Sequence, residues 1–171
     1  MEGKIFEFLN NANRLKAIED SGMANADFDP AYDFLMEKIC FDLRVPAAFI
    51  SIIEPHRQFF KSQNGLPDML AQLRETSLDL SICQNIILDG APVVINDITN
   101  DGKFSHHPAR FEFGIIAYLG EPLCYEGQVI GAVCAFHTRP RQWSKADRLT
   151  LQSIVTDIEA EIYFRRFSKI G

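Results

Sequence analysis

Four cysteines supply the strongest nucleophiles in this chain, and their spacing decides which thiol chemistry is available to it. The sequence contains no C-x-x-C pair and no zinc-ligand pattern, so neither a redox dithiol motif nor a structural zinc site is predicted. In a reducing compartment, cysteines of this kind are free and mostly buried thiols. The four residues are Cys40, Cys83, Cys124 and Cys134.

Cys83 is the candidate for a reactive thiol. It lies in SICQNIIL, a predicted short helix over residues 80–88 that follows the polar stretch RETSLDLS. A thiol near a helix N-terminus can have a lowered pKa and react as a thiolate. The other interpretation is a buried thiol that faces the sheet, and the sequence leaves both open.

Cys124 and Cys134 lie on two predicted strands joined by the turn Glu126-Gly127. That turn predicts a register in which Cys124 faces Val129 and Cys134 faces Leu119. The two thiols are then five residues apart along the ladder, or about 16 Å. A disulfide between them is excluded at that distance, so Cys134 is predicted to be a core residue.

The histidines do not predict a metal site. His106 and His107 are adjacent and therefore point to different sides of any regular element, and no third ligand follows at useful spacing. One of the pair could line a pocket, or both could be surface-loop residues. His56 and His137 receive no role. Because G-x-G-x-x-G, P-loop and G-x-S-x-G motifs are also absent, no catalytic residue is predicted.

A binding pocket is better supported than a catalytic centre. Residues 98–114 are polar, aromatic and interrupted by Gly and Pro, and a long irregular stretch of this kind is often functional. Apolar walls with a few polar groups are what a small-molecule pocket needs. The alternative is that these aromatics fill the core beneath a loop. The stretch contributes Phe104, His106, His107, Arg110, Phe111 and Phe113.

The elements that must position these residues form an α+β pattern in which antiparallel hairpins are flanked by helices. Asp29 and Pro30 predict the start of the second helix, and Ser144 and Asp147 form a capping box for the last. The strand after the Glu126-Gly127 turn is apolar on both faces, so the sheet is expected to be covered on both sides. Helices are predicted over residues 1–22, 29–45, 80–88 and 144–168, and strands over 47–53, 57–65, 92–97, 115–125 and 128–138.

Composition excludes several classes of protein. The 171 residues are 47% hydrophobic and 23% charged, as in ordinary globular domains. The net charge of -6 disfavours a nucleic-acid partner. No apolar run is long enough to span a membrane, and the charged N-terminus lacks the apolar core of a signal peptide, so the expected compartment is the cytoplasm.

Several motifs in this order resemble a common bacterial group of GAF domains, which are small-molecule-sensing modules. They are HRQFFKSQNGLP, SICQNII, PVVINDITNDGKFSHHP and YLGEPLCYEGQVIGAVCAFHTRPRQWS, and the resemblance covers about residues 14–165 of a single domain spanning 1–171. It implies a central antiparallel sheet of five or six strands, with the N- and C-terminal helices on one face and a ligand pocket on the other. It also implies dimers formed through the terminal helices.

Individual branches of the GAF family can be compared residue by residue. Branches that carry a bilin use a cysteine near the pocket helix, and here His106-His107 occupy that neighbourhood without one. GAF enzymes that reduce methionine-R-sulfoxide use several cysteines. Cys83 falls near one of their positions, but the partner expected between 98 and 116 is missing. The signature of the nucleotide-binding branch is also absent.

The resemblance therefore predicts a sensory or regulatory GAF domain rather than an enzyme. Its partners would be a small-molecule ligand and a second copy of the chain, with no nucleic acid and no membrane, and the residues name no particular cofactor. The alternatives are a thiol-dependent methionine-R-sulfoxide reductase centred on Cys83 and a ligand-free interaction module. The expected ligand-binding residues are Phe60, Cys83, Asp97, Phe104, His106, His107, Phe111, Tyr118 and Cys134.

Overall fold

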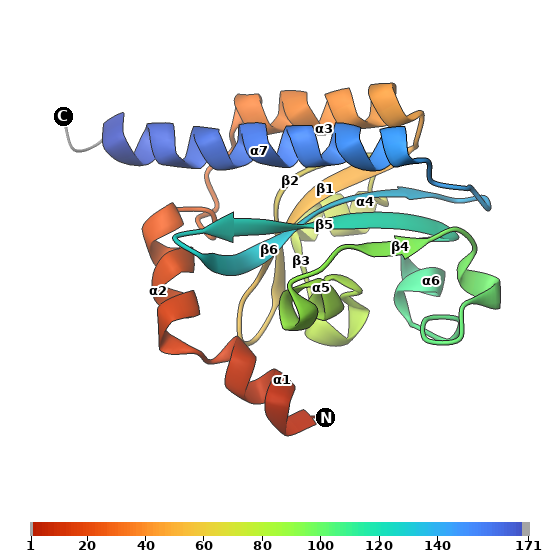
Figure 1. Ribbon diagram of the computed structural model, residues 1–171, viewed down its shortest axis with the longest axis horizontal. Helices are drawn as coiled ribbons and strands as arrows, with labels where there is room; N and C mark the ends of the chain where they lie inside the picture. Colours follow the sequence, from red (N-terminus) through yellow and green to blue (C-terminus); the bar gives the residue numbers. More distant parts are fainter. Residues whose placement is uncertain (1, 169–171) are drawn as a thin grey trace.

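A six-stranded antiparallel sheet organises the computed structural model, which describes residues 2–168 (Figure 1). Met1 and residues 169–171 of the predicted domain lie outside the described residues. The strand order is β3-β2-β1-β6-β5-β4, so the predicted antiparallel α+β architecture is confirmed. The strands are β1 Ala47–Ile53, β2 Gln58–Asn64, β3 Glu75–Thr76, β4 Val93–Ile95, β5 Ala117–Tyr125 and β6 Gln128–His137.

Helices cover both faces of this sheet (Figure 1). The α-helices are α1 Glu2–Leu9, α2 Ala12–Ser21, α3 Pro30–Leu43, α4 Asp68–Leu73, α5 Cys83–Asp89, α6 Ala109–Glu112 and α7 Lys145–Ser168. Two 3₁₀ turns, η1 Leu78–Leu80 and η2 Ile98–Asn100, complete the chain. Among residues 2–168, no helix is long and apolar enough to cross a membrane.

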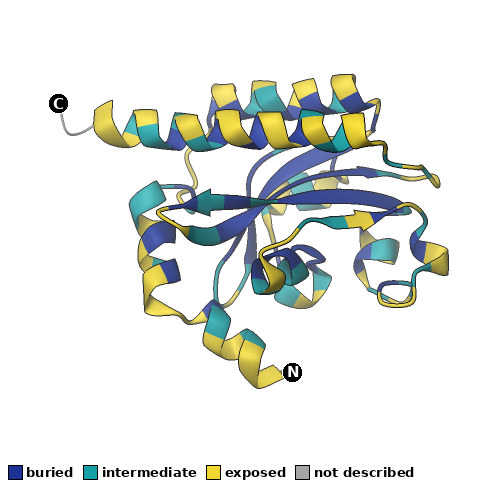
Figure 2. Cartoon of the chain, in the orientation of Figure 1, coloured by how far each residue is buried: buried dark blue, intermediate teal, exposed yellow. Residues whose placement is uncertain are grey.

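The two faces of the sheet have separate cores. Helices α3 and α7 lie side by side on one face, and with α2 they bury the first core, which includes Met36 and Ile158 (Figure 1). Helix α5 and the segment around α6 bury the second core, which includes Ile86 and Phe113. The strands between the two cores are buried along most of their length (Figure 2). The predicted covering of both faces is therefore confirmed.

The single helix predicted over residues 1–22 is wrong, because the chain forms α1 and α2 with a break at Asn10 and Asn11. The Asn11 side chain accepts a hydrogen bond from the backbone N–H of Arg14 at 3.0 Å and caps α2. The buried Arg14 side chain donates to the Leu9 carbonyl at the end of α1 at 3.1 Å. As a result α1 turns away from α2, and Leu9 joins the second core rather than the first.

The β5–β6 hairpin confirms the predicted turn but not the whole register. Glu126 has a φ of 50° and Gly127 a φ of 74°, as a two-residue hairpin turn requires. Cys124 faces Val129 as predicted, but the register then shifts by one residue, so Cys134 faces Gly120 rather than Leu119. The cause is a bulge that leaves one extra residue on β6, which the turn sequence does not reveal.

The remaining boundaries follow the expected local signals. Asp29 caps α3 with Pro30 in its first turn, and Ser144 and Asp147 exchange the two hydrogen bonds of a capping box before α7. The predicted helix over 80–88 is shorter and begins at Cys83, because residues 78–80 form a 3₁₀ turn. That later start puts the cysteine at the end of the helix nearest the sheet centre.

Candidate functional site

Two cysteines and a tyrosine meet beneath the centre of the sheet. Cys83 Sγ, at the start of α5, lies 3.3 Å from Cys134 Sγ on β6. The Tyr118 hydroxyl on β5 lies 3.1 Å from Cys83 Sγ and 2.9 Å from Cys134 Sγ. All three residues are at most 1% exposed. The structure thus forms a closed triangle of two thiols and one phenol from three different elements.

A glycine on β5 allows this triangle to form. A Cβ atom at Gly120 would lie 2.6 Å from Ile86 Cδ1 and 2.9 Å from the Tyr118 ring. Any larger residue would push α5 and the tyrosine ring away from the sheet. Because Gly120 faces Cys134 in the register, the missing side chain also leaves room for the phenol beside the thiol.

The two thiols have different acidities. Burial raises the pKa of Cys83, but hydrogen bonds from Cys134, Tyr118, Ser51 and Ser81 together outweigh burial and hold that pKa below its usual value. Burial and the hydrogen bond to Cys83 raise the pKa of Cys134 well above its usual value. Burial likewise raises the pKa of Tyr118. These directions make Cys83 the more acidic of the two thiols.

A buried amide network lies next to this triangle. Gln58 on β2 accepts hydrogen bonds from Ser51 Oγ at 2.8 Å and from Ser81 Oγ at 3.0 Å. Its amide nitrogen donates to Thr76 Oγ1 at 2.9 Å. The network ties the edge strand β3 and the segment before α5 to the middle of the sheet. Sequence reasoning missed it, although a serine inside AAFISII, an otherwise apolar strand, was a signal.

Phenylalanine rings occupy the rest of this face. Phe49 and Phe60 have ring centroids 5.3 Å apart in an edge-to-face arrangement. Phe113 lies 6.2 Å from Phe60 and 6.3 Å from Phe136. Such pairs are close enough for favourable aromatic contacts. The packing favours the interpretation in which aromatic side chains, including Phe113 of the 98–114 segment, form a core on this face.

The predicted ligand-binding residues divide into two groups. The structure brings together five buried members in the second core: Phe60, Cys83, Phe104, Tyr118 and Cys134. The other four occupy the loop region around η2 and α6, and each is at least partly exposed: Asp97, His106, His107 and Phe111.

The four loop residues have local partners or face solvent. Asp97 caps η2 by accepting from the backbone N–H of Thr99 at 3.0 Å. His107 Nδ1 accepts from the Ala109 backbone N–H at 3.1 Å, and burial lowers the pKa of this histidine. His106 is exposed, and the Phe111 side chain is 69% exposed. Of these four, His107 reaches the buried five, because its ring lies 6.0 Å from the Phe104 ring between centroids.

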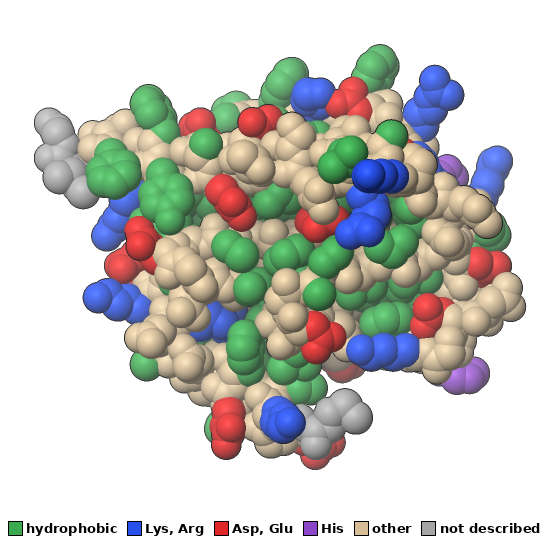
Figure 3. Space-filling view, in the orientation of Figure 1, with side chains coloured by type: hydrophobic (Ala, Val, Ile, Leu, Met, Phe, Trp, Pro, Cys, Tyr) green, Lys and Arg blue, Asp and Glu red, His purple; other side chains and the backbone are tan. Residues whose placement is uncertain are grey.

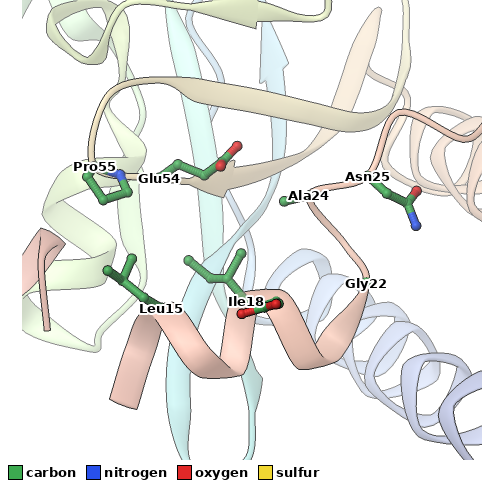
Figure 4. Close-up of a pocket in the computed structure, with 8 residues that line it drawn as sticks. Leu15, Ile18, Gly22, Ala24, Asn25, Glu54 and Pro55 are labelled. Carbon is green, nitrogen blue, oxygen red and sulfur yellow. The ribbon is translucent and has the colours of Figure 1, made fainter. Parts of the chain in front are cut away.

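Two surface pockets lie away from the predicted residues. One, of about 360 Å³, lies between α2 and the β1–β2 turn (Figure 4). Its lining is Leu15, Ile18, Glu19, Gly22, Ala24, Asn25, Glu54 and Pro55. The other, of about 560 Å³, lies between the α2–α3 connection and the end of α7, where Phe28, Tyr32 and Arg165 line it. Among residues 2–168, no group of three His, Cys, Asp or Glu side chains could hold a metal ion.

Comparison with known proteins gives a consistent family. The family model for GAF domains matches residues 27–162. A cyclic di-GMP phosphodiesterase of Pseudomonas aeruginosa is 28% identical over 131 residues, or 75% of this chain. The chain spans about a fifth of that relative, 22% of its length.

Solved structures show the same fold. The GAF domain of a phosphoenolpyruvate-protein phosphotransferase from Coxiella burnetii superposes with a TM-score of 0.68 at 16% identity, covering 95% of this chain and 99% of that one. A type II free methionine-R-sulfoxide reductase from Thermoplasma acidophilum gives a TM-score of 0.60 at 18% identity, covering 77% and 89%. At these identities the similarity extends to the fold alone.

Proposed function

We propose that this chain, which belongs to the GAF domain family, senses a small molecule on the α5–α6 face of its sheet. GAF domains are typically modules of signalling and sensing proteins. The observation that supports a ligand on this face is the set of polar groups, the Cys83–Tyr118–Cys134 triangle and the Gln58 network, buried among apolar walls. That combination suits a largely apolar ligand with one or two hydrogen-bonding groups.

Short elements make this face the one that can open. Helix α5 has seven residues and α6 has four, whereas α3 and α7 on the other face have 14 and 24. Short helices are held by few contacts and belong to the least stable part of a fold. A ligand would take the place of aromatic side chains such as Phe60 and Phe113 by displacing α5 or the 98–114 segment.

Native mass spectrometry of the purified protein tests ligand binding directly. A retained small molecule should appear as added mass that is lost on denaturation, and it should slow hydrogen exchange in residues 83–89 and 98–116. Tyr118→Phe, which removes one polar contact and little volume, should weaken retention, whereas Tyr163→Phe on α7 should not. If no compound from a metabolite library adds mass or protects these segments, ligand sensing at this face is refuted and the ligand-free interaction module is favoured.

The terminal helices carry the proposed output through a homodimer. The exposed side of α7 presents Phe164 and Phe167, which are 67% and 66% exposed, and α3 beside it presents Phe34 and Phe41. Hydrophobic side chains protrude along this face (Figure 3). Exposed aromatic residues are typical of association surfaces. Because α1 turns to the other core, we place the dimer contact on α7 and α3 rather than on the first helix.

Light scattering tests this surface. The wild type should be a dimer, and the double variant Phe164→Glu/Phe167→Glu should be a monomer with unchanged circular dichroism. Phe111→Glu, on an equally exposed phenylalanine of the other face, is the control and should remain dimeric. A monomeric wild type at high concentration would count against the proposal.

We propose no enzymatic activity for the domain. The reductase alternative would need a substrate as large as an amino acid to reach Cys83, which is 1% exposed, and no second cysteine lies between residues 98 and 116. An assay of free methionine-R-sulfoxide reduction decides between a domain without enzymatic activity and the reductase. Inactive wild type removes the reductase, whereas turnover that is lost in Cys83→Ser would establish it.

A further inference from the structure

We propose that Cys83 and Cys134 form a redox-modification site, in which a small peroxide converts the two buried thiols into a disulfide that links α5 to β6. The sequence separates these residues by 51 positions, and only the fold brings their sulfurs to 3.3 Å. This modification goes beyond ligand sensing and does not depend on it.

The distance supports bond formation with little movement. A disulfide bond is about 2.05 Å long, so the sulfurs must approach by about 1.3 Å. Strand β6 is paired on both sides, with β1 and β5, and is the fixed partner. Helix α5 is short and ends at Gly90, which has a φ of 61°. The helix is therefore the element that moves, and the disulfide would hold it against the sheet.

The two sulfurs have different roles in the reaction. Neutral donors surround Cys83, and they include the Tyr118 hydroxyl at 3.1 Å, so Cys83 carries the thiolate that attacks. The raised pKa of Cys134, caused by burial and by Cys83, keeps that residue as a thiol until it resolves the intermediate. One nucleophile and one resolving thiol in direct contact are what a reversible peroxide response needs.

The chemistry balances with hydrogen peroxide as the oxidant. The Cys83 thiolate attacks one peroxide oxygen, the O–O bond breaks, and the departing hydroxide takes up the proton released by Cys83 to give water. The sulfenic acid on Cys83 is then attacked by Cys134 sulfur; the S–O bond breaks, and hydroxide leaves with the Cys134 proton as a second water. The two thiols lose two electrons, and the peroxide gains them.

The other two cysteines provide matched controls. Cys40 packs at the edge of the first core, and the backbone N–H of Cys124 donates to Glu159 on α7 at 3.0 Å, so neither residue belongs to the Cys83–Tyr118–Cys134 triangle. Burial raises the pKa of each thiol, so less of either is present as thiolate. Both are nevertheless more exposed than Cys83 and Cys134. A bulky thiol reagent should therefore reach Cys40 and Cys124 first, whereas peroxide should oxidise the buried pair first.

Intact mass spectrometry of the folded full chain tests the proposal. The reductant is removed, and the protein is treated briefly with hydrogen peroxide and then alkylated in denaturant. Disulfide formation should remove about 2 Da from the wild type, and the reagent should then alkylate two thiols instead of four. Peptide mapping should join residue 83 to residue 134, and dithiothreitol should reverse the change. The double variant Cys40→Ser/Cys124→Ser should behave like the wild type, and Cys83→Ser should form no intramolecular disulfide.

Other outcomes would overturn the assignment. A disulfide that contains Cys40 or Cys124 would contradict the assignment. So would sulfinic acid on Cys83 with Cys134 still available for alkylation, because Cys134 would then not have attacked the sulfenic acid. Four alkylated thiols after treatment that oxidises a free cysteine peptide would do the same. Because the mapping is made on the wild type, these outcomes are decisive even if Cys83→Ser fails to fold.

Discussion

Replacing Gln58 by methionine should destabilise the protein by about 3 kcal/mol, because the amide is the hub of the buried network beside the two thiols. Methionine is unbranched and close to glutamine in length, so the change removes hydrogen bonds with little loss of volume. Gln58 is 1% exposed, and water cannot replace the amide without opening the sheet. Three hydrogen bonds are lost, to Ser51, Ser81 and Thr76.

The magnitude follows from the partners that remain. A typical buried hydrogen bond contributes about 1 kcal/mol net, which gives about 3 kcal/mol for the three. Thr76 Oγ1 still donates to the Ser77 carbonyl at 2.8 Å, so no donor is left unsatisfied there. The Ser51 and Ser81 hydroxyls lose the Gln58 oxygen but keep their contact with Cys83 Sγ, a weaker acceptor, which limits the further cost. For a chain of this length, about 3 kcal/mol lowers the melting temperature by about 6–12 °C.

Urea unfolding monitored by circular dichroism measures this difference. Gln72→Met, at an exposed position on α4, is the control and should change stability by less than about 0.5 kcal/mol. Adding Ser51→Ala and Ser81→Ala to Gln58→Met should recover part of the loss, because no buried hydroxyl is then left with sulfur as its remaining acceptor. A loss below about 1 kcal/mol for Gln58→Met would refute the role of the network in holding the site.

Three further changes test other features of the fold. Gly131→Ala should cost about 3 kcal/mol in urea unfolding, because its Cβ would lie 2.0 Å from the Ser51 carbonyl oxygen and force β1 and β6 apart. Ser144→Ala should cost about 1 kcal/mol and lower the melting temperature by about 2–4 °C, because it removes half of the capping box with Asp147. Burial raises the pKa of Glu121, so its contribution to stability is complete below the unfolded pKa and declines as pH rises through the folded pKa. Glu121→Gln should abolish that decline in urea unfolding measured from pH 4 to 8, and an unchanged pH profile would contradict it.

The sequence predicted five of the six strands and the two hairpin pairings, β1–β2 and β5–β6, because these depend on local signals, but it missed the two-residue strand β3. The apolar run at 47–53, the Glu126-Gly127 turn and the Ser144–Asp147 capping box each involve residues close together in the chain. The break between α1 and α2 was missed because the hydrophobic stripe continues across it. The Asn11 cap marks the break, and the hydrogen bonds of the Arg14 side chain to the Phe8 and Leu9 carbonyls, which only the three-dimensional structure shows, satisfy the end of α1.

Part of the geometry of the candidate site was not predictable for the same reason. Phe60, Tyr118 and Cys134 lie on strands and share the second core, and strand alternation is the local rule that puts such side chains on one face. The contact between Cys83 and Cys134 depends on where α5 packs on the sheet, and the hydrophobic periodicity of the sequence does not predict that position. The bulge on β6 also moved the register by one residue at Cys134. Residues in irregular segments, such as Phe111, do not alternate regularly between the two faces of an element. Composition alone therefore does not predict that the Phe111 side chain is exposed.

The redox site and the proposed ligand site share one moving part, because α5 both carries Cys83 and covers Tyr118. A disulfide to β6 would raise the free energy needed to lift α5, while leaving the 98–114 segment free to move. A ligand that enters by lifting α5 should therefore bind the reduced protein more tightly than the oxidised one. A ligand that enters past α6 should bind both states alike, so titration of the two states identifies the route. Since ligand binding and disulfide formation are linked through α5, a ligand that binds the reduced protein more tightly must also shift the dithiol–disulfide equilibrium of Cys83 and Cys134 toward the two thiols.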